Sequence, residues 1–115
     1  MAYSEPYEVL DEKTREITRA ITSLREELEA INWYHQRVAT TQDLSLKEIM
    51  AHNRDEEIEH ACMTIEWLRR NMDKWDDELR TFLFTSGSLV SLETGEQGDE
   101  DESSESTLAI GSMKS

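Results

Sequence analysis

The sequence has few of the residues that would place it in several common classes of protein. It contains a single cysteine, Cys62, which excludes an internal disulfide. No apolar run approaches the about 20 residues needed to span a bilayer, and no basic, apolar start resembles a signal peptide. We therefore expect a cytosolic protein without a membrane span.

Basic residues are also scarce. The 115 residues include 12 Lys and Arg against 26 Asp and Glu, which gives a formal net charge of -14. Because contacts with phosphate need clusters of Lys or Arg, this balance argues against a nucleic acid partner. Cations are a better match for such a chain.

Much of the negative charge lies in the last third of the chain. Residues 85–106 have no basic side chain and carry half of the net charge, on Glu93, Glu96, Asp99, Glu100, Asp101, Glu102 and Glu105. Since this stretch is also full of Ser and Gly, it cannot bury enough apolar surface to offset its chain entropy. We expect a disordered acidic linker over residues 85–106, after a folded helical domain over residues 1–84.

The first helix is expected to begin near Ser4 and Pro6, a capping residue followed by a proline that the first turn tolerates. No strand-like alternation or internal repeat is visible. Apolar residues recur at steps of seven, four and three, at Leu10, Ile17, Ile21, Leu24, Leu28, Ile31 and Val38. One helix cannot bury such a stripe alone.

A second helix is expected after a break at residues 40–43, capped either by Asp43 or by the pair Ser45 and Glu48. Its stripe consists of Leu46, Ile49, Met50, Ala61, Thr64, Trp67 and Leu68. A third, shorter helix, capped by Asp73, would carry Trp75, Leu79, Phe82, Leu83 and Phe84. The predicted fold class is all-α, an antiparallel two-helix hairpin plus a short third helix. Its core is thin, so we expect self-association.

Polar residues interrupt the stripe of the second helix. With about 100° of rotation per residue around the helix axis, Asn53, Glu57 and His60 lie on the same face as the apolar stripe, between Met50 and Thr64. Glu57 and His60 form a Glu-x-x-His pair, whose spacing points a carboxylate and an imidazole to one side, as a shared metal requires. Such a pair is also common on acidic helices without any metal. Its place in an apolar stripe favours a metal site, since burial without a partner would cost several kcal/mol.

Glu27 on the first helix projects to the side of Leu24 and Ile31. One hairpin therefore offers a single Glu27 and a single Glu57–His60 pair, whereas a ferritin-like four-helix site uses two of each. A two-fold axis through the site would bring both sets together and hold two metals about 4 Å apart. We predict that two hairpins dimerise into a ferritin-like four-helix bundle.

Several blocks of the sequence resemble the encapsulated ferritin family. They are EELEAINWY at residues 26–34, HNRDEEIEH at 52–60 and EWLRRN at 66–71. The likeness spans both long helices, from about Leu10 to Phe84. At the other end, LAIGSMK at residues 108–114 resembles the docking peptide that cargo proteins present to encapsulin shells.

This resemblance implies a ferroxidase that oxidises Fe(II) with dioxygen at a di-iron centre between two subunits. Antiparallel dimers would form a ring, commonly a decamer. Glu27, Glu57 and His60 match the iron ligands, and Tyr34 matches a residue that supports the centre. One imidazole with carboxylates suits iron, although Zn or Mn could take the same ligands. A site where metal enters, which calcium could also occupy, is implied at Glu26, Glu29 and Trp33.

The likeness of the tail implies an encapsulin shell protein as partner and a cytoplasmic encapsulin nanocompartment as location. The docking peptide would be residues 107–115, with contacts made by Leu108, Ile110, Gly111 and Met113. An open ring has no cavity for mineral, so the shell would store the oxidised iron. The linker would span roughly 25 Å on average, which lets the ring sit away from the shell wall. The alternative for this tail is an ordinary frayed terminus.

Other functions remain open. A noncatalytic divalent-metal buffer or cargo adaptor would use the same acidic helices, and a structural hairpin that binds another protein would hold no stoichiometric iron. His35 projects near Leu28 and Ile31, where it could be a satisfied interface histidine or an extra metal contact. Cys62 is expected to face away from the core, without a catalytic role.

Overall fold

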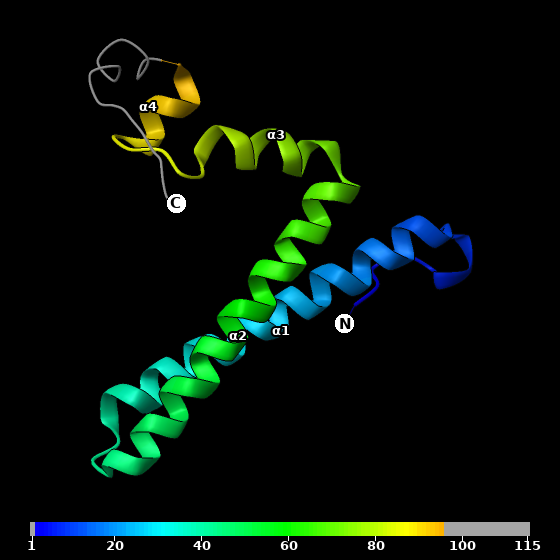
Figure 1. The fold of residues 1–115 in the computed structure, drawn as a ribbon. Coiled ribbons are helices and arrows are strands. Elements are labelled where there is room, and N and C mark those ends of the chain that lie inside the picture. The colour runs from blue at the N-terminus through cyan, green and yellow to red at the C-terminus, as the bar shows by residue number, and fades with distance from the viewer. Residues whose placement is uncertain (1, 96–115) are drawn as a thin grey trace. The chain divides into compact units, whose positions relative to one another are not determined.

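The computed structural model describes residues 2–95, which form a succession of helices (Figure 1). A 3-10 turn, η1 (Tyr7–Val9), precedes the two long helices α1 (Glu12–Thr40) and α2 (Leu44–Asn71), and two short helices follow, α3 (Asp73–Phe82) and α4 (Leu89–Thr94). No strand occurs among the described residues. The prediction of an all-α fold with a two-helix hairpin and a short third helix is confirmed. None of these helices is long and apolar enough to cross a membrane.

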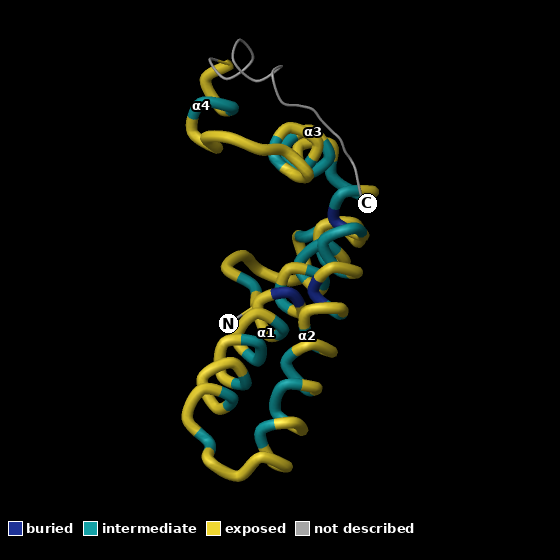
Figure 2. The backbone as a smooth tube through the Cα atoms, turned by 60° about the vertical axis from the view of Figure 1, so that its left-hand side comes forward, coloured by how far each residue is buried: buried dark blue, intermediate teal, exposed yellow. Residues whose placement is uncertain are grey.

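The chain divides into two compact units, Met1–Asn71 and Met72–Ser115. In the first unit, α1 and α2 run antiparallel and pack along each other. The buried apolar side chains among the described residues are Leu24 on α1 and Ala61 and Leu68 on α2, with Leu68 at 0% exposure. Figure 2 shows that these positions lie away from the α1–α2 turn. The hairpin therefore has a thin core, which lies in the half farther from the turn.

Much of the apolar surface of the hairpin stays uncovered in a single chain. The large apolar residues that remain exposed on α1 and α2 include Ile21, Leu28, Trp33, Leu44, Leu46, Ile49, Ile58, Met63 and Trp67. Scattered exposed apolar residues are ordinary, and those on this hairpin are available for contact with another protein surface.

The start of α1 differs from the prediction. The helix is capped at Asp11, whose side chain accepts a 2.8 Å hydrogen bond from the Thr14 backbone N–H. This bond also lowers the pKa of Asp11. The expected start near Ser4 and Pro6 is wrong because the preceding residues fold back: Arg15 donates to the Tyr7 carbonyl at 2.6 Å, and its guanidinium lies 3.8 Å from the centre of the Tyr7 ring.

The start of α2 is capped by Asp43, one of the two possibilities left open by the sequence. Its carboxylate accepts hydrogen bonds from the Leu46 backbone N–H at 2.9 Å and from Ser45 Oγ at 2.7 Å. The bond from Leu46 is the main cause of the lowered pKa of Asp43. The short connection between the helices thus ends in a well-satisfied helix N-terminus.

In the second unit, α3 begins with Asp73 as its first residue, while Met72 is the N-cap and makes no side-chain capping bond. The predicted capping role of Asp73 is therefore wrong. The helix ends before Leu83, and Phe84 adopts a positive φ of 59° with its side chain 96% exposed.

The expected disordered linker also differs from the structure, because residues 89–94 within it form α4. Ser88 caps this helix by accepting a 3.1 Å bond from the Ser91 N–H, and Gly95 ends it with a φ of 84°. Caps at both ends, together with local apolar residues, allow a helix in a segment whose composition is polar overall. The rest of the predicted linker and the predicted docking peptide, residues 107–115, lie outside the described residues.

Candidate metal centre

The Glu57 and His60 side chains lie together on α2, as their spacing predicts. Glu57 Oε1 is 3.5 Å from His60 Nδ1, and the two side chains are 29% and 45% exposed. One carboxylate oxygen and one imidazole nitrogen thus converge on a half-buried part of the helix. Both atoms are suitable donors for a divalent metal.

Glu27 lies on α1 and turns toward α2. Its Oε2 is 3.5 Å from Thr64 Oγ1, which also donates to the His60 carbonyl oxygen at 3.1 Å. Its Oε1 is buried and has no hydrogen-bond partner among the described residues. A buried polar atom without a partner costs about 1–3 kcal/mol, and more when it is charged. A cation at Oε1 would offset this cost, so the residue fits a role as a metal ligand.

The second nitrogen of the His60 ring also faces a carboxylate. His60 Nε2 lies 3.9 Å from Glu56 Oε1, and the other Glu56 oxygen lies 3.9 Å from His52 Nε2. The sequence reasoning missed Glu56, although its position four residues before His60 places it on the same side of the helix. Carboxylates on both sides of the imidazole make this part of α2 attractive to cations.

The described residues of one chain do not form a complete ligand set. Over residues 2–95, no group of three or more His, Cys, Asp and Glu side chains is arranged to hold a metal ion. The structure brings Glu57 and His60 together and places Glu27 beside the next turn of α2, through Thr64. A site with two metals needs further ligands from elsewhere.

The residues predicted to admit metal lie on the surface of α1. Glu26 and Glu29 are exposed, and Trp33 is 50% exposed beside Gln36 in a shallow groove. Tyr34 is half-buried, with the Arg37 guanidinium 5.4 Å from the centre of its ring. The predicted docking residues lie outside the described part of the chain: Leu108, Ile110, Gly111 and Met113.

A sequence model of the EncFtn-like family matches residues 2–86 of the chain. This protein belongs to the EncFtn-like family. A "Ferritin-like protein" of Thermotoga maritima is 53% identical over 96 residues, which cover 84% of each chain. An "Encapsulated ferritin-like protein" of Rhodospirillum rubrum is 48% identical over 120 residues, which cover 96% of this chain and 86% of that one.

A solved structure agrees with this assignment. The crystal structure of a protein from Nitrosomonas europaea matches with a TM-score of 0.74 and 53% sequence identity. The match covers 76% of this chain and 96% of the Nitrosomonas chain. The resemblance to encapsulated ferritins seen in the sequence is thus confirmed. The matched EncFtn-like region, residues 2–86, contains every candidate metal ligand.

His35 of this EncFtn-like chain contacts the facing helix. Its Nδ1 lies 3.2 Å from Arg54 Nη1, and Arg54 Nε also donates to Asp55 at 3.0 Å. Of the two roles that the sequence left open, this contact favours the interface histidine. An arginine beside the ring also repels a metal cation.

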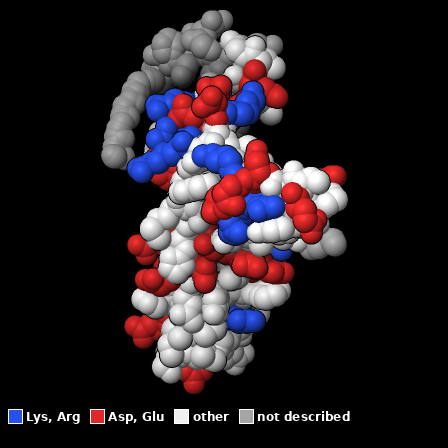
Figure 3. All heavy atoms as spheres, turned by 90° about the vertical axis from the view of Figure 1, so that its right-hand side faces the viewer, with Lys and Arg blue, Asp and Glu red and all other residues white. Residues whose placement is uncertain are grey.

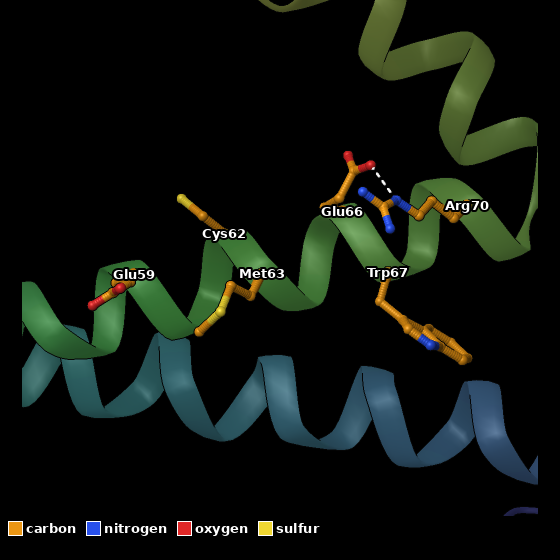
Figure 4. A pocket seen from close by; sticks show the side chains of 6 residues that line it. All are labelled: Glu59, Cys62, Met63, Glu66, Trp67 and Arg70. Atoms are coloured by element: carbon orange, nitrogen blue, oxygen red, sulfur yellow. Dashed lines mark hydrogen bonds and ion pairs between the residues drawn. The ribbon is translucent and has the colours of Figure 1, made fainter.

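One side of α2 carries a shallow groove of about 480 Å³, lined by Glu59, Cys62, Met63, Glu66, Trp67 and Arg70 (Figure 4). In this view Met63 and Trp67 extend toward α1, whereas the exposed Cys62 points away from it. Glu66 bonds to Arg69 at 2.8 Å and to Arg70 at 2.7 Å. These two arginines lower the pKa of Glu66 to about 2.

Charge is unevenly spread over the surface of the hairpin. On the face in Figure 3, acidic side chains flank a mostly uncharged surface that extends to the α1–α2 turn at the bottom of the view. The exposed apolar residues near this turn include Leu44, Leu46 and Ile49. A surface of this kind is suited to contact with another protein surface rather than with a polyanion.

Proposed function

We propose that this protein is a ferroxidase, which oxidises Fe(II) to Fe(III) with dioxygen at a centre shared by two subunits. Glu27, Glu57 and His60 of each subunit would hold the iron. The observation that carries this proposal is the buried Oε1 of Glu27, which has no partner among the described residues, while Oε2 of the same carboxylate contacts Thr64, one turn after His60. Membership of a family whose relatives include a "Ferritin-like protein" supports it.

Two subunits are required by the count of ligands. One chain supplies three donor side chains, whereas a ferritin-like di-iron site uses four carboxylates and two histidines. A two-fold axis beside Glu27 would bring its copies together and add a Glu57–His60 pair from each chain. Two Fe(II) substrate ions would each supply one electron to dioxygen, which would be reduced by two electrons and take up protons from solvent, and the carboxylates would stabilise the additional positive charge of Fe(III). Tyr34 is half-buried on α1, about two helical turns after Glu27, and would support the centre.

Association through the hairpin would also cover its exposed apolar side chains. We infer a homo-oligomer of antiparallel dimers, with a decameric ring as the form that the family likeness implies. Glu26 and Glu29, exposed near Trp33, would attract Fe(II) toward the centre. Calcium could bind the same carboxylates.

The oxidised iron would be stored in an encapsulin shell. The name of the relative from Rhodospirillum rubrum, an "Encapsulated ferritin-like protein", supports this role as cargo. Residues 107–115 would dock to the shell protein and place the enzyme inside the compartment. Deleting these residues should abolish encapsulation during co-expression with a shell protein and leave the rate of iron oxidation unchanged.

The proposed activity is tested by adding Fe(II) to the purified full chain in air and following the absorbance of Fe(III). Glu57→Ala or His60→Ala should remove most of the rate above that of iron alone. Glu48 is an exposed carboxylate on the same helix, so Glu48→Ala is the matched control and should retain the rate. Equal rates in all variants, with iron still bound, would favour the noncatalytic metal buffer. Absence of stoichiometric iron would favour a structural hairpin.

Assembly provides a second test of the shared centre. The facing carboxylates of two subunits repel each other until metal neutralises them. Anaerobic Fe(II) should therefore shift wild-type protein to a larger species in sedimentation velocity, and Glu57→Ala should lose this shift. The same sedimentation with and without iron would contradict the coupling between metal and assembly.

A further inference from the structure

Thr64 occupies the point at which α2 meets the Glu27 side chain. Its hydroxyl is part-buried and lies close to two acceptors, the His60 carbonyl oxygen at 3.1 Å and Glu27 Oε2 at 3.5 Å. A hydroxyl has one proton and can donate it to only one of them at a time. The His60 carbonyl oxygen is the nearer of the two acceptors.

The two acceptors differ in how much they lose when the Thr64 hydroxyl no longer donates a hydrogen bond to them. The His60 carbonyl oxygen also accepts the regular backbone hydrogen bond of the α-helix, so it remains satisfied without the hydroxyl. Glu27 Oε2 has a negative charge to share, and a hydrogen bond to a charged acceptor is roughly twice as strong as a neutral one. A small rotation of the Thr64 hydroxyl can therefore redirect its hydrogen bond from the carbonyl oxygen to the carboxylate at little cost.

We propose that Thr64 is a positioning residue for the metal-bound Glu27 carboxylate. Its hydroxyl donates to Oε2 and fixes the rotation of the carboxylate, so that the buried Oε1 faces the metal. This inference rests on the proposed role of Glu27 as an iron ligand. No covalent bond changes, and the hydroxyl proton stays on Thr64 throughout.

The unequal surroundings of the two Glu27 oxygens carry this inference. Oε1 has no partner among the described residues, whereas Oε2 faces a hydroxyl donor. A ligating carboxylate held by a second group in this way binds metal more tightly, and loss of such a partner typically lowers affinity by about 10–100-fold. Valine has nearly the shape of threonine without the hydroxyl, so Thr64→Val isolates this effect.

The test uses the full chain and Co(II), a divalent metal that air does not oxidise at these ligands on the time scale of a titration. Thr64→Val should raise the Kd for Co(II), followed by its visible absorption, by about 10–100-fold. Thr64→Ser restores the hydroxyl and should bring the Kd close to the wild-type value. Thr81→Val, which removes a similar 3.0 Å bond to the Asp77 carbonyl oxygen, should leave the Kd unchanged.

A purely structural role would affect folding and leave metal affinity unchanged. Thr64→Ala removes the same hydroxyl with a residue that favours helix, so it should retain helical circular dichroism and show the same weakened binding. Wild-type affinity in either Thr64→Ala or Thr64→Val would overturn the inference. If wild-type protein itself binds no Co(II), the proposed metal centre fails instead, so the two failures are distinguishable.

Discussion

Replacement of Glu27 by methionine should stabilise the metal-free protein. Among the described residues, Glu27 Oε1 is buried without a partner, and Oε2 has a 3.5 Å contact with Thr64. Removal of an unsatisfied buried polar atom should raise the free energy of unfolding by about 1–3 kcal/mol. Methionine has a similar length and helix propensity, and Thr64 keeps its bond to the His60 carbonyl oxygen, so no new unsatisfied group arises.

The measurement is urea denaturation of metal-free protein, followed by circular dichroism at one fixed protein concentration because association would also shift the midpoint. For a small domain, whose m-value is about 1–2 kcal/mol/M, the expected gain corresponds to about 1 M in the urea midpoint. Glu59→Met is the matched control, because Glu59 is exposed on α2. Its free energy of unfolding should stay within about 0.5 kcal/mol of wild type.

The same pair of variants should respond differently to metal. Anaerobic Fe(II) should stabilise wild type and Glu59→Met, since a ligand that binds the folded state raises the free energy of unfolding. Glu27→Met should lose most of this gain. A Glu27→Met protein that is less stable than wild type without metal would refute the reasoning, because it would mean that the carboxylate already has favourable partners.

Three further outcomes follow from the packing and the charges. Leu68→Ala should lower the free energy of unfolding by about 2–5 kcal/mol in urea denaturation, because the side chain is fully buried. Asp43→Ala should lower the melting temperature and Asp43→Asn should retain most of it, because both Asp and Asn can cap α2. The pKa of Glu66 is depressed from 4.5 to about 2 by Arg69 and Arg70, so its contribution to stability is present above pH 4.5 and is lost as the pH falls through about 2. An NMR titration of the Glu66 carboxyl carbon should show this midpoint. Glu66→Gln should reduce the loss of unfolding free energy that occurs as the pH falls.

The hairpin could be predicted from sequence because its apolar residues follow helical spacing over many turns. The stripe containing Leu24 and the one containing Leu68 both supply buried residues of the structure. The start of α1 was not predictable in the same way. Asp11 and Ser4 are both possible caps, and the choice depends on Arg15 reaching back to Tyr7, a contact that spacing does not reveal.

The candidate site was predictable in its main residues and less so in their neighbours. Glu57 and His60 were found because they interrupt an apolar stripe, and they do lie 3.5 Å apart. Helical spacing places Thr64 in the apolar stripe, four residues after His60, and indicates no further role for it. Its contact with Glu27 depends on which turn of α1 faces it, and a single sequence does not fix this register between helices.

The uneven distribution of buried side chains has a consequence for local motion. Residues 25–60 include no buried position, whereas Leu24, Ala61 and Leu68 are buried in the half of the hairpin farther from the α1–α2 turn. The chain should therefore open most readily from the α1–α2 turn, and backbone amides there should exchange with deuterium sooner than those around Leu68. The boundary between fast and slow exchange falls in the part of α2 that carries Glu57 and His60. A cation bound there would slow deuterium uptake in the part of the hairpin nearer the α1–α2 connection.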